Sequence, residues 1–155
     1  VVQTQGSPQE TIKIVSAGET IPCGSLSFTV PEGFTFYISK EDGTIFADAS
    51  MTSYISVAAQ EIPNMAGMEG VISSIESTIL DLAVETAIGT PDSKGTEQFV
   101  TGSWYVYNYS DTSALGIPGS IRVYMRISGV EMQVIMFMGN IANMDCSGIM
   151  NNNFR

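Results

Sequence analysis

Apolar and polar residues alternate with a period of two through much of this 155-residue chain. This alternation indicates strands that bury one face and expose the other. It is clearest in five segments, Leu26–Val30, Phe34–Ile38, Phe99–Tyr109, Ile121–Ile127 and Val130–Gly139. Thr11–Val15, Thr44–Ala49 and Ser53–Ile62 have a similar, weaker pattern. The pattern predicts a sheet-rich fold, in which the apolar run Val134–Met138 forms a buried strand.

Helical periodicity is found in one long segment, Met68–Ile88. Gly89 and the Thr90-Pro91 step supply its stop signal. Its apolar stripe consists of Val71, Ile72, Ile75, Ile79, Leu82 and Thr86, widened by Leu80 and Val84. Its solvated face consists of Glu69, Ser73, Glu76, Ser77, Asp81 and Glu85. A second, short helix is predicted at Cys146–Phe154, where Asp145 is suited to cap the N-terminus.

These elements predict an α+β domain with a central, mostly antiparallel sheet. In chain order they give a hairpin, a long helix, a three-stranded meander and a C-terminal helix. The length suits one domain, which we assign to residues 23–155. Residues 1–22 form an N-terminal tether that can add a strand at Thr11–Val15. The polar first ten residues resemble the segment that follows a removed signal or lipid-anchored leader.

The cysteines, Cys23 and Cys146, stand near opposite ends of the chain. A disulfide between them would close a loop around almost the whole domain. The alternative is two free buried thiols, because unpaired cysteine is itself a strongly buried residue type. We favour the disulfide, which is typical of a secreted protein or of the outer face of a bacterial envelope.

Composition argues against several classes of function. The net charge of −10 would repel nucleic acid and anionic lipid. No apolar run approaches the ~20 residues that span a bilayer. The absence of histidine removes the usual general base and a common zinc ligand. Glu41, Asp42 and Asp48 flank a turn and are best interpreted as surface acids. We therefore predict neither a metal nor a cofactor.

The most suggestive residues are tyrosines and arginines on two neighbouring predicted strands. Both residue types are enriched at protein contact surfaces. If exposed together, they could bind a protein, an acidic peptide or a glycan. The alternative is that this face lies beneath a helix or the N-terminal segment. The candidate residues are Tyr105, Tyr107, Tyr109, Arg122, Tyr124 and Arg126.

The order of elements resembles the Mog1/PsbP-like fold. Two sequence motifs are similar to those of small secreted bacterial members of this fold family. They are Leu26-Ser-Phe-Thr-Val-Pro-Glu-Gly-Phe34 and Asp145-Cys-Ser-Gly-Ile-Met-Asn-Asn-Asn-Phe154. Other members include a Ran-binding nuclear import factor and photosystem II accessory proteins. The resemblance implies a non-catalytic binding or accessory module and carries over no binding residues. A carboxylate-dependent hydrolase or lyase, and a purely structural envelope module, are the alternatives.

Overall fold

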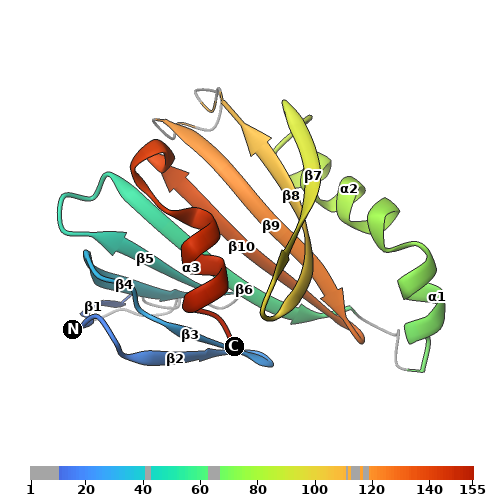
Figure 1. Ribbon diagram of the computed structural model, residues 1–155, viewed down its shortest axis with the longest axis horizontal. Coiled ribbons are helices and arrows are strands. Elements are labelled where there is room, and N and C mark those ends of the chain that lie inside the picture. The colour runs from blue at the N-terminus through green and yellow to red at the C-terminus, as the bar shows by residue number, and fades with distance from the viewer. Residues whose placement is uncertain (1–10, 41–42, 63–66, 111, 113–115, 117–118) are drawn as a thin grey trace, which may run out of the picture.

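The structure is a computed structural model that describes residues 11–40, 43–62, 67–110, 112, 116 and 119–155 (Figure 1). Its strands are β1 Thr11–Ile14, β2 Thr20–Cys23, β3 Leu26–Thr29, β4 Phe34–Lys40, β5 Gly43–Asp48, β6 Ser53–Glu61, β7 Ser93–Phe99, β8 Gly102–Tyr109, β9 Ser120–Ser128 and β10 Glu131–Gly139. Its helices are α1 Glu69–Ser74, α2 Glu76–Ala87, the 3-10 turn η2 Ile141–Asn143 and α3 Cys146–Asn152.

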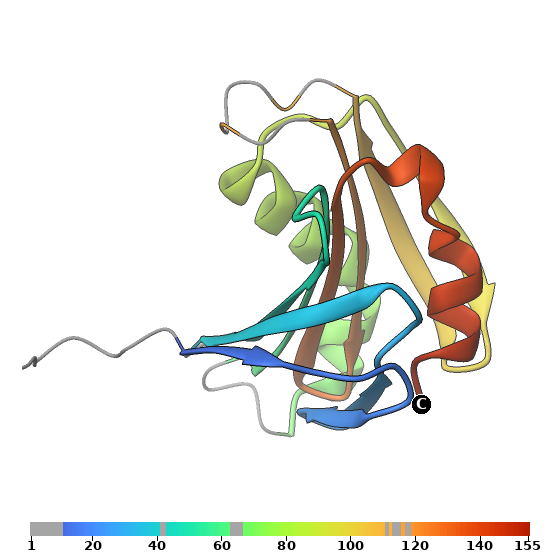
Figure 2. The same ribbon diagram turned by 90° about the vertical axis from the view of Figure 1, so that its left-hand side faces the viewer.

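Eight of the strands form one antiparallel sheet in the order β1-β4-β5-β6-β10-β9-β8-β7. Strands β2 and β3 form a separate hairpin. Helices α1 and α2 lie on one side of the sheet and α3 lies on the other (Figure 2). We call these sides the α2 face and the α3 face. The predicted α+β class and mostly antiparallel sheet are confirmed.

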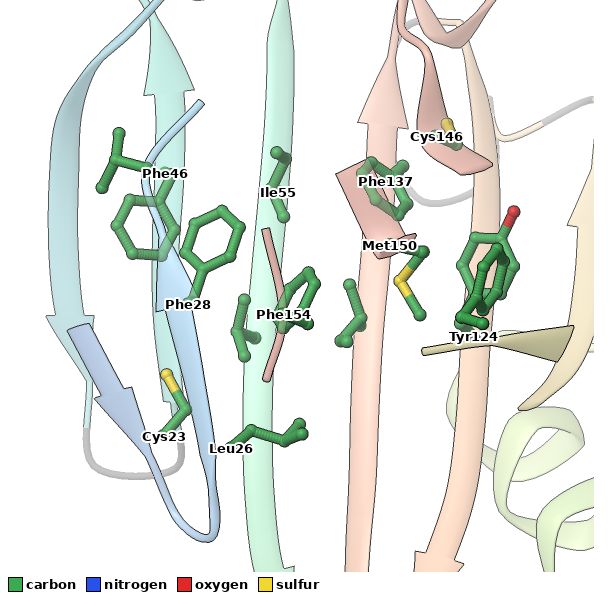
Figure 3. Close-up of a cluster of buried hydrophobic side chains, with 14 of the residues drawn as sticks. Cys23, Leu26, Phe28, Phe46, Ile55, Tyr124, Phe137, Cys146, Met150 and Phe154 are labelled. Carbon is green, nitrogen blue, oxygen red and sulfur yellow. The ribbon is translucent and has the colours of Figure 1, made fainter. Parts of the chain in front are cut away.

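Two distant parts of the chain close the α3 face. The Phe28 ring, from the hairpin, lies 4.7 Å from the ring of Phe46 and 4.6 Å from that of Phe154, measured between centroids. All three side chains are fully buried (Figure 3). Ser27 and Arg155 exchange backbone hydrogen bonds of 2.9 and 3.1 Å. The C-terminus therefore pairs with the hairpin and holds it over the sheet.

A polar cluster fixes the tip of the same hairpin. Ser25 Oγ donates a 2.7 Å hydrogen bond to Glu131, and the buried Gln133 amide donates to Ser25 Oγ at 2.9 Å. Arg126 Nε donates to Gln133 at 2.6 Å, and its guanidinium lies 4.6 Å from the Trp104 ring centroid. Burial alone would raise the pKa of Glu131, but hydrogen bonds from Gln133 and Ser25 bring it below its ordinary value. The carboxylate therefore stays ionised while it anchors the hairpin.

The predicted helix over Met68–Ile88 is interrupted at Ile75, which separates α1 from α2. The buried residues are Ile72, Leu80 and Val84, which are separated by multiples of four along the chain, whereas Ile75 and Leu82 lie to one side of this row and are exposed. Glu76, expected in solvent, instead accepts a 2.8 Å hydrogen bond from the Ile127 backbone N–H. The predicted buried stripe was therefore partly wrong. None of the described helices is long and apolar enough to cross a membrane.

The strand predictions were confirmed except in two places. No strand was predicted where β2 lies, and the predicted strand Phe99–Tyr109 crosses the turn between β7, which ends at Phe99, and β8, which begins at Gly102. Neither β2 nor β7 has clear apolar alternation, because β7 is an exposed edge strand and β2 is a short hairpin arm. Asp145 caps α3 as expected, accepting from the Gly148 N–H at 3.1 Å. The first ten residues of the tether assigned to residues 1–22, and most of the segment 110–119 between β8 and β9, lie outside the described residues.

The predicted disulfide was wrong, because Cys23 and Cys146 are both buried free thiols. Cys23 ends β2, whereas Cys146 begins α3, and Figure 3 shows them on opposite sides of the same apolar cluster. Position near the two chain ends did not bring them together. Burial raises the pKa of both thiols, that of Cys146 to about 11.

Thiol titration should find no rapidly reacting group in the native protein and two groups after denaturation. Burial and the raised pKa values both suppress thiolate formation at neutral pH. The melting temperature should be the same with and without reductant. A melting temperature that falls on addition of reductant, together with no titratable thiol in the denatured protein, would show that Cys23 and Cys146 form a disulfide.

Candidate functional site

The six tyrosines and arginines predicted to share a surface lie on two different faces. Partners across an antiparallel pair share a face. Tyr105, Tyr107 and Tyr109 pair with Met125, Val123 and Ile121, on the α2 face. Arg122 and Tyr124 pair with Asn108 and Val106 on the α3 face, where Arg126 also lies. The expectation of a single patch was wrong, because it assumed a β8–β9 register that is off by one residue.

On the α2 face, two of the tyrosines lie beneath α2. Tyr107 is 1% exposed and its hydroxyl donates to Asp81 at 2.8 Å. Tyr109 is also buried, and its hydroxyl donates to the Gly89 carbonyl at 2.7 Å. Burial raises the pKa of both phenols. Tyr105 is half-buried at the edge of the same cluster. These residues hold α2 on the sheet.

On the α3 face, the remaining candidates also have internal partners. Tyr124 is fully buried, and its hydroxyl donates to Glu97 at 3.0 Å. Burial raises the pKa of Tyr124 to about 12. Arg122 Nε donates to Asn108 at 2.7 Å, and Arg126 belongs to the hairpin cluster described above. These three side chains are therefore hydrogen-bonded within the domain and do not form an exposed patch.

A different surface is unusually apolar: the part of the α2 face that α2 does not cover. One row of cross-strand partners runs from the edge strand β1 to β8 along this face. Exposure is 61% at Ile12 and falls to 1% at Val123 and Tyr107, which lie under α2. The intervening residues are half-buried. The full row is Ile12, Ile38, Ile45, Ser56, Met136, Val123 and Tyr107.

The position of α2 explains why no helix in the described part of the chain covers this area. Asp81, on one flank of α2, forms a 2.6 Å ion pair with Lys94 of β7 and accepts from Tyr107 of β8. The opposite flank, with half-buried Ile79 and Ala83, therefore faces β10. Beyond it, the side chains of five strands form what we call the open face. Its apolar members are Ile12, Phe36, Ile38, Ile45, Tyr54, Ala58, Met132, Val134, Met136 and Met138, and the polar Ser56 and Gln60 lie among them.

Two hollows mark the ends of the open face. One of about 310 Å³ is lined by Phe36, Ile38, Ile45, Tyr54 and Met138, among others. The other, of about 210 Å³, lies between β6 and β10 and is lined by Ala58, Gln60, Glu61, Ile62, Met132 and Val134. Glu61 is the only charged residue among the described residues that line either hollow. The surface is suited to apolar contact.

Three carboxylates of the domain, Asp48, Asp81 and Glu131, have pKa values below the ordinary range and are held in their ionised form. Hydrogen bonding from Lys94 lowers the pKa of Asp81. Burial would raise the pKa of Asp48, but hydrogen bonds from Ser53, Thr52 and Ser50 make it lower than usual. Asp48 thus organises its own turn, while Glu41 and Asp42 lie outside the described residues. Among the residues that the structure describes, no three acidic or cysteine side chains gather to hold a metal.

The sequence contained a signal for the open face that the alternation pattern concealed. In β10, Ile135 and Phe137 point to the α3 face, and Met132, Val134, Met136 and Met138 point to the α2 face. The run predicted a strand buried on both sides, and only one side is fully buried. A strand that is apolar on both sides needs a covering layer on each face of the sheet. The one long helical segment predicted from the sequence is too narrow to cover a whole face of eight strands.

Comparison with known proteins identifies the fold. No protein-family model and no curated protein sequence matches the chain. Among solved structures it is similar to the solution structure of cyanobacterial PsbP (CyanoP) from Synechocystis sp. PCC 6803. The TM-score is 0.53 at 11% identity, over 99% of this chain and 96% of that one. The chain therefore has a Mog1/PsbP-like fold, as the sequence resemblance implied.

Spectrophotometric titration of the tyrosines should show a class that ionises late. The phenols of Tyr107, Tyr109 and Tyr124 should ionise above the ordinary value of ~10. Their neutral forms stabilise the fold fully below that pH, and this stabilisation is lost as the pH rises through their folded-state pKa values. Tyr124→Phe should remove a component near pH 12. Titration of every tyrosine near pH ~10 in the native protein would contradict the burial described here.

Proposed function

We propose that this PsbP-like domain is a non-catalytic binding module that receives an apolar partner on its open face. The observation that carries the proposal is the open face, a set of mostly half-buried apolar side chains beyond the edge of α2. Contiguous exposed apolar surface on a soluble domain marks a site of contact with a partner. A bound partner would cover the part of the α2 face that α2 leaves exposed.

Electrostatics favours binding over catalysis. A general acid among carboxylates needs a pKa raised towards neutrality. Asp48, Asp81 and Glu131 are instead shifted downwards by hydrogen bonds and nearby cations. The alternative of a carboxylate-dependent hydrolase or lyase is therefore the less favoured one. A purely structural envelope module would also use the open face, but for a permanent contact.

The proposal includes a location outside the cytoplasm, in the cell envelope or secreted. That part now depends on the polar composition of the first ten residues. The cysteines no longer support it, because they are unbonded.

Binding of the neutral, apolar dye Nile red tests the proposal. Its fluorescence should rise on mixing with the native protein. The double variant Met136→Gln/Met138→Gln should bind about tenfold more weakly, because replacing two apolar contacts with amides costs ~1.4 kcal/mol or more. Both side chains are only half-buried, so the variant should retain its fold.

Val100→Gln is the matched control, since Val100 is 62% exposed and lies in the β7–β8 turn, away from the open face. It should bind the dye as the native protein does. Circular dichroism and melting curves should show that all three proteins are folded. Equal dye binding by the native protein and the double variant would refute the open face as the binding surface.

A further inference from the structure

We infer that the partner segment that occupies the open face is an amphipathic α-helix with a basic polar side. This inference depends on the proposed function and names the chemistry of the occupant. The first argument is size. From Met132 to Met138, β10 spans ~20 Å at ~3.4 Å per residue. The hollows lie at the two ends of this span, at Met138 and at Met132. A helix of about 13 residues has the same length.

The second argument is hydrogen bonding. An extended segment lying across the open face would leave its own N–H and C=O groups against apolar side chains, at a high cost in free energy. The face offers few polar partners, and the Tyr54 hydroxyl already donates to the Met51 carbonyl at 2.5 Å. A helix satisfies its backbone internally. A small polar ligand would need orienting groups that this face does not supply.

The third argument is the type of side chain on the face. Met132, Met136 and Met138 lie along one strand, and Met51 lines the hollow beside Met138. Methionine is unbranched and polarizable, so it adapts to side chains of different shape. Surfaces rich in methionine suit the apolar stripe of a helix, which presents residues at positions i, i+3, i+4 and i+7.

The fourth argument is charge. The described lining residues include Glu61 and no lysine or arginine, and the chain carries a net charge of −10. A helix with basic residues on its solvent side is attracted by this field. A second copy of the chain brings the same negative charge and is repelled. These four properties together select the basic amphipathic helix over the other occupants.

Three dye-labelled peptides of about 13 residues test the inference with the full chain. The first has leucine and lysine in a helical pattern, the second replaces lysine with glutamate, and the third scrambles the first. Fluorescence anisotropy should show the patterned leucine–lysine peptide binding at least about tenfold more tightly than either control, a difference of ~1.4 kcal/mol. Circular dichroism should show that it gains helix on binding.

Val134→Glu and Val100→Glu separate contact from simple attraction of charge. Both add one negative charge, but only Val134 lies on the open face. Val134→Glu should weaken binding of the patterned peptide about tenfold or more, and Val100→Glu should leave it unchanged or slightly stronger. If Val134→Glu does not fold, Met136→Gln/Met138→Gln replaces it with the same expectation.

Equal binding of the patterned and scrambled peptides, or equal effects of the two glutamate variants, would overturn the inference. So would light scattering that shows a dimer which Val134→Glu dissociates, because a second copy would then occupy the face. If Nile red binding still depends on Met136 and Met138 after such a result, the open face remains a binding surface, but its partner is not a basic amphipathic helix. If Nile red binding does not depend on them, both the proposed function and the further inference are wrong.

Discussion

Strand β10 carries apolar side chains on both of its faces, and the rest of the structure follows from the need to cover them. Ile135 and Phe137 are fully buried on the α3 face, whereas Met136 and Met138 on the α2 face are only half-buried. Because successive side chains of a strand alternate between faces, no change of register could bury both sets with one layer. The strand therefore requires two layers, and the residues that the structure describes supply one layer and a part of another.

The complete layer is made from the two ends of the domain. The β2–β3 hairpin and α3 cross the α3 face, and the pairing of Phe28 with Phe154 joins them. The cluster of Arg126, Gln133, Glu131 and Ser25 then fixes the hairpin tip. On the other face, α2 is held towards β7 and β8 by the contacts of Asp81. Because α2 is attached at one side of the sheet, none of the described helices covers the open face (Figure 2).

Local patterns in the sequence predicted most elements of the fold, and their mutual arrangement was harder to predict. Alternation located the main strands, and Asp145 marked the start of α3. The placement of Tyr105 and Tyr124 on opposite faces could not be predicted, because it depends on the β8–β9 register, which is set by pairing across a loop. The prediction of a disulfide between Cys23 and Cys146 was wrong for a similar reason, because positions in the sequence do not determine distances in the folded domain. The open face depends on the position of α2, which side-chain contacts decide.

Carbon-13 NMR of methionine methyl groups during a Nile red titration tests the central claim most directly. Met132, Met136 and Met138 lie on the open face, whereas Met150 is fully buried on the α3 face. The account predicts saturable shifts of the first three methyl signals and no change at Met150. Shifts confined to methionines away from β10, or saturable dye binding with no shift on β10, would contradict it.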